Sequence, residues 1–261
     1  MISTTSRGPR VLLTRPQHQA EPLQDAVRQA GGDVIAFPVM DIVARDTADI
    51  DRELGARAVA DIVVFVSPNA VQHGSAAARD AKHVAAIGAA TAAALQQAGY
   101  SADIVPVTGF DSEALLQEAA LQQVNGKTVL IVRGDGGREL LAQTLGARGA
   151  QVEYLSVYER RRHQPSAAAL HELQATWRQH GIDYVIAMSV ASLEFLLELL
   201  PSTCRHALPA SALVTPSARV LKTAQERIPG MRALLSESPA TGDLLAAMLA
   251  DRQAQTDDKN D

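Results

Sequence analysis

The sequence predicts an α/β protein made of two related units, each a parallel sheet with helices on both faces. Short apolar runs of strand length alternate along the 261 residues with longer stretches rich in alanine and leucine. Strands that alternate with helices are typical of parallel sheets covered on both faces. The order of elements also recurs once, at a period of about 120–130 residues, which is the size of a domain and far above a solenoid period.

Strands in the first half are predicted from β-branched and apolar runs, and helices from alanine- and leucine-rich stretches. Paired glycines at Gly31 and Gly32 end the first helix, and Gly99 ends a later one. Asp111 or Ser112 caps the last helix of this half. The expected strands are residues 11–13, 34–43, 61–66 and 84–87, and the expected helices are residues 19–30, 68–79, 90–98 and 112–122.

The second half repeats this order, and Gly149 ends its first helix as the paired glycines do in the first half. The chain end is polar and acidic, so residues 251–261 are expected to form a disordered tail. The expected strands are residues 128–132, 152–159, 183–187, 212–214 and 232–236, and the expected helices are residues 137–148, a stretch ending at residue 200, 218–227 and 242–251.

The repeat is visible in the residues themselves. Residues 11–16 read VLLTRP and match residues 129–134, VLIVRG, so that Arg15 corresponds to Arg133. Residues 61–67, DIVVFVS, match residues 183–189, DYVIAMS. In parallel sheets of this kind, ligands bind at the carboxyl ends of the strands, and two such sheets facing each other form a cleft. The residues directly after each strand are therefore the candidate site.

Composition excludes several classes of protein. Hydrophobic residues make up 47% and charged residues 20%, which is an ordinary globular balance. A net charge of −5 and an aromatic content of 3% leave neither a basic surface nor stacking residues for nucleic acid. The single cysteine excludes a disulfide framework and a Cys-rich zinc site. Because no signal peptide or membrane-spanning run is visible, we expect a cytoplasmic protein with no membrane or nucleic-acid partner.

Small hydroxyl residues, glycines and arginines follow the predicted strands. The glycine run after residues 128–132 lets a ligand approach the backbone at a helix start, which is an anion site; the alternative is a tight turn beside a solvated arginine. Serines at helix starts either act only as caps or also direct donors at a ligand. The candidate binding residues are Thr14, Arg15, Ser67, Pro68, Asn69, Gly88, Thr91, Ser112, Arg133, Gly134, Gly137, Arg138, Ser189, Ser217 and Thr241.

Other kinds of site are not indicated. The sequence has no G-x-G-x-x-G fingerprint, no P-loop lysine and no G-x-S-x-G elbow. It has no metal-type cluster, and its histidines, such as His73 and His163, are expected at the surface. Tyr158 stands apart, because it ends an extended segment joining the halves where the first half has Met40. Its side chain either packs as a connector residue or directs its hydroxyl into the cleft.

Several of these motifs together resemble the uroporphyrinogen-III synthase family. The resemblance runs from about residue 10 to residue 249 and depends on the order and spacing of short motifs rather than on one of them. The motifs are VLLTRP at residues 11–16, Ser67-Pro68-Asn69-Ala70, Ile87-Gly88 with Thr91, Asp111-Ser112-Glu113 before a Leu-Leu pair, VLIVRGDGGRELL at residues 129–141 and Tyr158-Glu159-Arg160.

The resemblance implies two flavodoxin-like lobes joined by a two-stranded connector, with the chain crossing between lobes. Residues 1–37 and 162–250 would form one lobe and residues 46–154 the other. Residues 38–45 and 155–161 would be the connector strands.

The resemblance also implies the reaction. The family closes the linear tetrapyrrole hydroxymethylbilane into uroporphyrinogen III, with loss of water and inversion of ring D, and uses no cofactor and no metal. Tyr158 matches the family tyrosine that assists departure of the hydroxyl, and Ser67 and Thr91 would bind substrate carboxylates. The resemblance further implies a monomer that receives its substrate from hydroxymethylbilane synthase.

Two alternatives remain open. A two-lobed ligand-binding regulator built on the same units would keep the cleft without needing Tyr158. A nucleotide-dependent transferase is disfavoured by the missing phosphate-binding motifs. Turnover of hydroxymethylbilane distinguishes the enzyme from the regulator, and tight nucleotide binding would favour the transferase.

Overall fold

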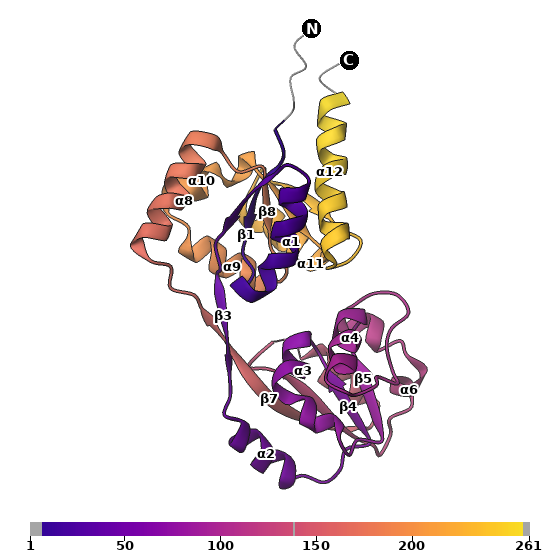
Figure 1. Ribbon diagram of the computed structural model, residues 1–261. Coiled ribbons are helices and arrows are strands. Elements are labelled where there is room, and N and C mark those ends of the chain that lie inside the picture. The colour runs from indigo at the N-terminus through magenta and orange to yellow at the C-terminus, as the bar shows by residue number, and fades with distance from the viewer. Residues whose placement is uncertain (1–6, 138, 258–261) are drawn as a thin grey trace. The chain divides into compact units, whose positions relative to one another are not determined.

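The computed structural model of the protein describes residues 7–137 and 139–257 (Figure 1). The chain divides into two compact units. Unit 1 combines the segment that ends at Asp41 with the segment that begins at Arg162, and unit 2 holds Ile42–Arg161. The first strand–helix–strand of the chain therefore belongs with the C-terminal strands, which confirms the predicted crossover.

Unit 1 contains a parallel five-stranded sheet, sheet 1, in the order β10-β9-β8-β1-β2. In chain order this is 2-1-3-4-5, the flavodoxin arrangement. Val11 of β1 pairs with Val34 of β2 on one side and with Tyr184 of β8 on the other. The strands are β1 (Arg10–Leu13), β2 (Asp33–Ala36), β8 (Tyr184–Ile186), β9 (Ala212–Thr215) and β10 (Arg232–Leu235).

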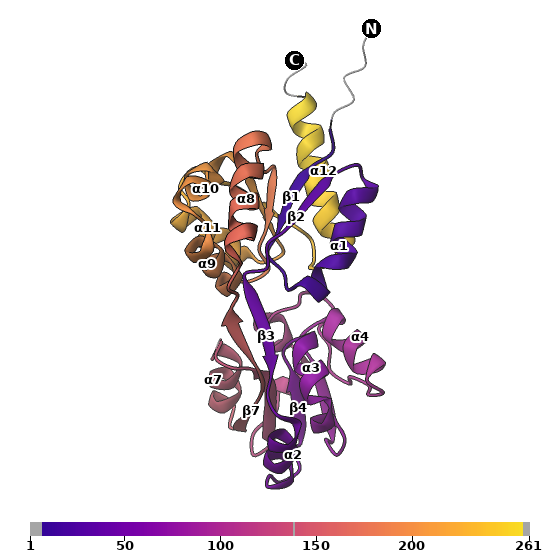
Figure 2. The same ribbon diagram turned by 60° about the vertical axis from the view of Figure 1, so that its left-hand side comes forward.

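Helices cover both faces of sheet 1 because its strands are apolar on both sides. Val11 and Leu13 pack with residues of α1 and α12, whereas Leu12 faces the other layer with Leu193 and other residues of α8, α9 and α11. Figure 2 shows α1 and α12 on one side and α8 and α9 on the other. The helices are α1 (Gln17–Gln29), α8 (Ala167–His180), α9 (Val190–Leu199), α10 (Ser202–Ala207), α11 (Ala218–Arg227) and α12 (Thr241–Asp257), with a 3-10 turn at Leu208–Ala210.

Unit 2 contains sheet 2, in the order β3-β7-β6-β4-β5, in which β4 is parallel to β5 and β6, and β6 to β7. Two buried clusters lie on its faces, one around Phe65 and Val132 and one around Val64 and Ile131. The elements are β3 (Met40–Ala44), α2 (Thr47–Gly55), β4 (Ile62–Phe65), α3 (Pro68–Gly74) with the 3-10 turn Ser75–Ala78, β5 (His83–Ala86), α4 (Ala89–Gln97), α5 (Ser112–Leu115), α6 (Ala119–Gln122), β6 (Thr128–Gly134), α7 (Leu140–Ala147) and β7 (Gln151–Arg162).

The chain passes between the units along β3 and β7. The amide of Arg45 donates to the carbonyl of Val157 at 3.1 Å, and the amide of His163 donates to the carbonyl of Val39 at 3.0 Å. Residue numbers fall along one segment as they rise along the other, so the two strands run antiparallel. This pair is the two-stranded connector that the resemblance implies, and with the two parallel sheets it confirms the predicted fold class.

Two predicted helices differ in the structure, and three helices were not predicted. The helix expected over residues 112–122 is divided into α5 and α6. The helix expected from Gly137 begins only at Leu140, because Gly136 and Gly137 have φ values of 64° and 113°, outside the helical region. Helices α2, α8 and α10 were not among the expected elements; α8 packs through Leu173 and Trp177 onto sheet 1.

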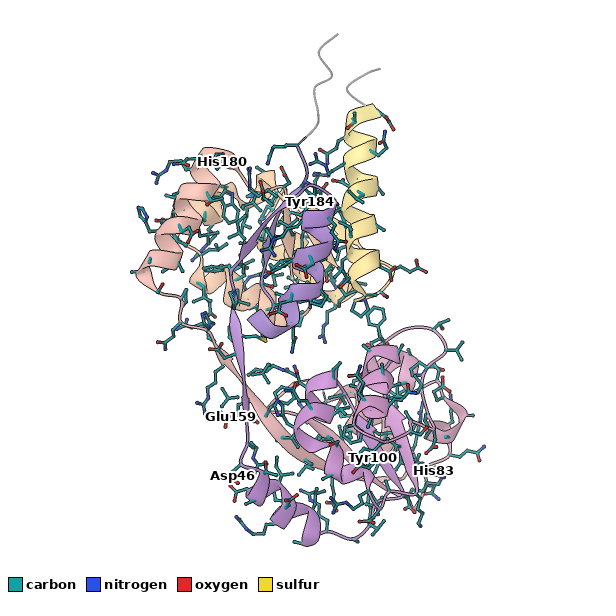
Figure 3. All side chains as sticks on the ribbon, in the orientation of Figure 1. Asp46, His83, Tyr100, Glu159, His180 and Tyr184 are labelled. Atoms are coloured by element: carbon teal, nitrogen blue, oxygen red, sulfur yellow. The ribbon has the colours of Figure 1, made fainter. Side chains whose placement is uncertain are left out.

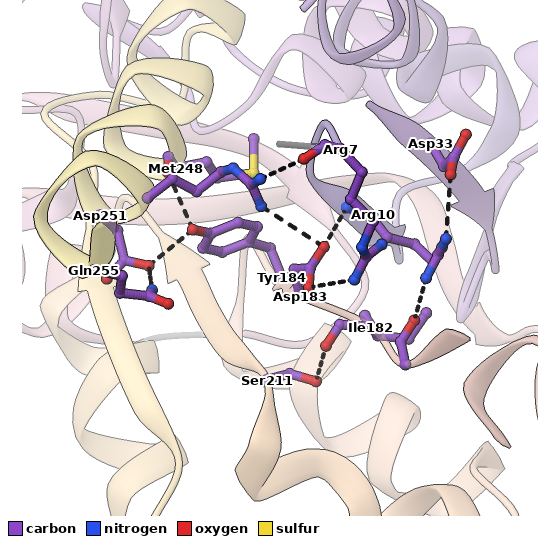
Figure 4. Close-up of polar contacts among 12 residues, drawn as sticks. Arg7, Arg10, Asp33, Ile182, Asp183, Tyr184, Ser211, Met248, Asp251 and Gln255 are labelled. Atoms are coloured by element: carbon purple, nitrogen blue, oxygen red, sulfur yellow. Dashed lines mark hydrogen bonds and ion pairs between the residues drawn. The ribbon is translucent and has the colours of Figure 1, made fainter. Parts of the chain in front are cut away.

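The predicted disordered tail, residues 251–261, is wrong for residues 251–257, because α12 continues to Asp257; residues 258–261 lie outside the described part of the chain. Polar contacts hold its last turns to sheet 1 (Figure 4). The Tyr184 hydroxyl donates to the Met248 carbonyl at 3.1 Å and to Asp251 Oδ2 at 2.8 Å, and Arg232 Nη1 lies 2.5 Å from Asp251 Oδ1. Among the described residues, none of the helices has both the length and the apolar character that crossing a membrane requires.

Candidate functional site

Tyr158 lies on β7 with its ring buried and its hydroxyl in polar contact. The side chain is 1% exposed and belongs to the core cluster around Phe65 and Val132. Its hydroxyl lies 3.2 Å from Ser67 Oγ and accepts a hydrogen bond from Arg160 Nη2 at 3.3 Å. The ring therefore packs as a connector residue would, while the hydroxyl takes part in a polar group with Ser67 and Arg160.

Gly134 makes room for the Tyr158 ring. The β6–β7 register shifts between Arg133 and Gly134, which brings Gly134 opposite Tyr158. A Cβ atom on Gly134 would lie 2.4 Å from Cε2 of the Tyr158 ring, a distance that two carbon atoms cannot adopt. The amide of Asp135 also donates to the Tyr158 carbonyl at 2.7 Å. The glycine at the end of β6 is thus explained by the tyrosine on the next strand.

Ser67 connects Tyr158 to the start of α3. Its backbone is extended, and its Oγ accepts from the amide of Ala70 at 3.0 Å, which is an N-cap contact. Pro68 occupies the first helical turn, where its missing N–H costs nothing, and Asn69 follows it. One oxygen atom therefore faces both the helix N-terminus and the phenol.

Gly88, Thr91 and Ser112 follow β5. A Cβ on Gly88, the cap residue of α4, would lie 2.8 Å from Cβ of Phe110, so glycine is required for this loop to pack. Thr91 is buried, and its amide donates to the Gly88 carbonyl at 3.0 Å. Of the two expected caps of the following helix, Asp111 holds the position, because its Oδ1 accepts from the amide of Ala114 at 2.8 Å.

Arg133 is buried and paired. Its Nη1 lies 3.1 Å from Glu139 Oε1, its Nε donates to the Gly134 carbonyl at 3.3 Å, and its guanidinium lies 4.7 Å from the centroid of the Tyr154 ring. The Tyr154 hydroxyl donates to the other oxygen of Glu139. These hydrogen bonds, first from Tyr154 and then from Arg133, lower the pKa of Glu139. The predicted Arg138 lies outside the described residues.

The matching residues of unit 1 are arranged differently. Thr14 Oγ1 donates to the carbonyl of Ile186 at 2.6 Å. Arg15, half-buried, donates through Nη2 to Met188 Sδ and to the Pro239 carbonyl, both at 3.2 Å. Burial lowers the pKa of Arg15, and no carboxylate in the described part of the chain forms an ion pair with it.

The serines of unit 1 act as helix caps. Ser189 and Ser192 form a reciprocal capping box at the start of α9. Ser217 Oγ accepts from the amide of Val220 at 3.4 Å at the start of α11, and Thr241 opens α12. Ser189 and Ser217 therefore cap their helices, whereas Thr241 is the first residue of α12.

Some residues around Tyr158 were not predicted. Arg160 is two residues from Tyr158 on the same strand, so the alternation of side chains could have placed both on one face. The ring centroid of His73 lies 6.1 Å from that of Tyr158. Tyr154 and Glu139 pair with Arg133, and no local pattern in the sequence indicates this contact. Within the described residues, no three His, Cys, Asp or Glu side chains gather as metal ligands would.

Comparison with known proteins identifies the family. The model of the family described as uroporphyrinogen-III synthase HemD matches residues 21–246. The uroporphyrinogen-III synthase of Salmonella typhimurium is 35% identical over 235 residues, which cover 83% of this chain and 90% of the relative. The enzyme of Escherichia coli is 31% identical over 233 residues, with the same coverage of both chains.

Solved structures agree in fold. A mutant uroporphyrinogen III synthase of Thermus thermophilus superposes with a TM-score of 0.63 at 19% identity, over 94% of this chain and 99% of that one. The Helicobacter pylori enzyme gives a TM-score of 0.59 at 14% identity, over 93% and 99%. At these identities the likeness supports the two-lobed fold alone. The family-model match and the bacterial relatives show that this chain belongs to the uroporphyrinogen-III synthase family.

Proposed function

We propose that this chain converts hydroxymethylbilane to uroporphyrinogen III as a cofactor-independent lyase. The carbon–oxygen bond of the substrate's hydroxymethyl group breaks, water leaves, and the resulting azafulvene is attacked by ring D, which becomes inverted through a spiro intermediate. Family membership supports the reaction. The observation that carries the proposal is the Tyr158 hydroxyl, held between Ser67 and Arg160 where the strands of sheet 2 end.

Tyr158 is the proposed proton donor to the departing hydroxyl. An arginine side chain has no acceptor, so Arg160 must donate to the phenol oxygen, and the phenol's own proton stays available. That proton is directed either to Ser67 or to the leaving group. The pyrrole nitrogen already assists the departure, so we expect help from Tyr158 near the low end of the range for general acids, about 10²-fold.

The predicted binding residues supply donors for the substrate's carboxylates. Ser67, Ser189 and Ser217 lie at the N-termini of α3, α9 and α11, where free backbone amides and the helix dipole favour anions. Arg15 adds a positive charge that no described carboxylate neutralises. We therefore propose that Thr14, Arg15 and the hydroxyl and glycine residues of both units bind the carboxylates, each contributing part of the affinity.

We further propose that the protein works as a cytoplasmic monomer that receives its substrate from hydroxymethylbilane synthase. The net charge of −5 supports a protein without nucleic-acid or anionic-membrane partners. Size-exclusion chromatography with light scattering tests the monomer, and a dimer at micromolar concentration would contradict it.

The test of the reaction is incubation with freshly prepared hydroxymethylbilane, followed by isomer analysis of the oxidised porphyrins. We expect the type III isomer. Only type I isomer, or binding without turnover, would favour a ligand-binding regulator instead.

The test of Tyr158 is Tyr158→Phe, which keeps the ring and removes the donor. We expect kcat to fall about 10²-fold, with KM and thermal stability little changed, because an interaction made in the transition state is lost. Tyr100→Phe in the same unit is the matched control (Figure 3). A Tyr158→Phe enzyme that turns over like the unmodified one would leave only the packing role.

A further inference from the structure

Arg15 and Arg133 occupy equivalent positions in the repeat, yet their surroundings differ. Both follow the first strand of a repeated unit. Arg15 contacts only a thioether and a carbonyl among the described residues, whereas Arg133 pairs with a carboxylate and lies over an aromatic ring. A guanidinium whose charge is already neutralised gains little from a second carboxylate, so the two arginines are not suited to the same task.

The polar contacts of Arg133 with described residues are directed at its own loop or at the strand beside it. Its Nε donates to the Gly134 carbonyl, and its Nη1 pairs with Glu139, at the two ends of the 134–139 segment. The Tyr154 ring covers the guanidinium, and the Tyr154 hydroxyl donates to the same carboxylate. Gly137 packs against Nη2, because a Cβ there would lie 2.9 Å from it. Arginine, carboxylate and tyrosine thus close the ends of one glycine-rich loop.

The same loop holds Tyr158. Gly134 lies against the Tyr158 ring, and the amide of Asp135 donates to the Tyr158 carbonyl. Gly137, which contacts Arg133, also approaches Arg160, since its Cβ would lie 3.8 Å from Arg160 Nη1. Arg160 in turn donates to the Tyr158 hydroxyl. A route of contact therefore runs from Arg133 through Gly134 to Tyr158, and Gly137 lies near both Arg133 and Arg160.

We propose that Arg133, Glu139 and Tyr154 form a positioning clamp that holds residues 134–137 and so fixes the Tyr158 ring and hydroxyl, rather than a binding site for a substrate carboxylate. The clamp rests on the proposed function, because it acts through the proton donor. It revises the role expected of Arg133 and leaves Arg15 as the arginine of the pair that no described carboxylate neutralises. Arg133 never touches the substrate in this arrangement.

Kinetics of matched variants test the clamp. Arg133→Lys keeps the charge but loses the planar fork and the stacking on Tyr154. We expect kcat to fall roughly tenfold with KM within twofold, because small displacements of a catalytic group are costly. Arg15→Lys should instead raise KM and leave kcat little changed. In a Tyr158→Phe background, Arg133→Lys should cause no further loss of kcat, since the group it positions is already gone.

A structural readout keeps the test independent of the reaction. NMR spectra of the protein with 13C-labelled tyrosine give ring signals that single Tyr→Phe variants assign. The ring signal of Tyr158 should shift in Arg133→Lys and in Tyr154→Phe, but not in Arg15→Lys. Tyr154→Phe keeps the stacked ring and removes only the hydroxyl, so it serves if Arg133→Lys does not fold.

Each outcome separates the clamp from the chemistry. An unchanged Tyr158 signal, a rise in KM without loss of kcat, or an equal loss of kcat in the Tyr158→Phe background would each overturn the clamp. A Tyr158→Phe enzyme with normal turnover would instead overturn the proton-donor role, while a shifted Tyr158 signal in Arg133→Lys would still support the clamp.

Discussion

The carboxyl edges of the two sheets come from one repeated pattern but differ in chemistry. Sheet 2 has Tyr158 with Ser67, Gly134 and the paired Arg133 around it. At the matching place in the first half of the repeat the chain has Met40, a buried apolar residue that begins β3 of sheet 2. The arginine of unit 1 that corresponds to Arg133 is Arg15, which forms no ion pair with a described carboxylate. The shared pattern accounts for helix caps and loop backbones, whereas the aromatic residue and its partners make one edge chemically distinct.

Ser67 and Ser189 show the difference within a matched pair. Both are extended cap residues whose Oγ accepts an amide three residues later. Ser67 Oγ also meets the Tyr158 hydroxyl, whereas Ser189 Oγ is 3.2 Å from Ser192 Oγ within its own capping box. The same local role is thus combined with an outside contact in only one unit.

The ionic contacts of sheet 1 gather at its other edge, where the strands begin (Figure 4). Asp183 accepts from the amide of Arg10 at 2.7 Å and pairs with Arg7 at 3.1 Å, and Asp251 on α12 joins Tyr184 and Arg232. In unit 1 these charged groups therefore hold a helix to the sheet, whereas in unit 2 a charged side chain, Arg160, contacts the candidate catalytic residue directly.

The largest effect is expected from Gly134→Ala. The new methyl group would lie within 2.5 Å of two ring carbons of Tyr158, so the ring must move. We expect kcat to fall by about 10²-fold or more, which is the loss expected when the general acid is removed. Gly146→Ala in α7 is the control, because a Cβ there meets nothing within 4 Å. Steady-state kinetics test this prediction. Equal kcat values for Gly134→Ala and Gly146→Ala would show that the edge of sheet 2 does not depend on the contact between Gly134 and Tyr158.

Asp251→Ala should affect stability and not catalysis. The carboxylate is nearly buried, and it accepts from Tyr184, Arg232 and Gln255. Hydrogen bonds to charged groups contribute about 1.5–3 kcal/mol, and we expect the free energy of unfolding to fall by an amount in that range. Urea denaturation measures the loss, and kcat should stay within twofold. A large fall in kcat would show that the two edges of sheet 1 are coupled.

Ser67→Ala and Ser189→Ala sharpen the comparison of the matched serines. Each should cost about 1 kcal/mol of stability through loss of a cap. Ser67→Ala should also lower kcat, by about 2–10-fold, the equivalent of one hydrogen bond, whereas of the kinetic constants Ser189→Ala should affect KM alone. Thermal melts and kinetics of both variants are the measurement. Equal kinetic effects would mean that the contact with Tyr158 adds nothing.

The smallest effect concerns alkaline stability. Burial, followed by the hydrogen bond to Asp251, raises the pKa of Tyr184 above that of a free tyrosine, about 10. Above pH 10 the unfolded chain releases this proton before the folded chain does, so stability falls as pH rises. Tyr184→Phe should flatten that fall, whereas Tyr100→Phe should leave it unchanged. Urea denaturation between pH 8 and about 11 tests this linkage, and an unchanged slope in Tyr184→Phe would contradict it.

Much of the fold and part of the site could be predicted from the sequence. The strand and helix pattern depends on local periodicity, and the caps at Ser67, Ser189 and Ser217 depend on a side chain bonding an amide three residues away. The crossover was implied by the family resemblance. The start of α7 was misplaced because the φ values of Gly136 and Gly137 follow from the loop they close. The end of α12 was misplaced because Asp251 looks like a tail residue until Tyr184 and Arg232 lie beside it.

Position in the repeat was enough to predict which residues follow the strands and that Tyr158 differs from its counterpart Met40. The packed chain was needed to reveal that Gly134 accommodates the Tyr158 ring, that Arg133 pairs with Glu139 and that Arg15 pairs with no described carboxylate. Those outcomes depend on a one-residue shift between β6 and β7 and on contacts with Glu139 and Tyr154 across the loop and the neighbouring strand. Register and pairing arise when separate segments pack together, and no short-range pattern encodes them.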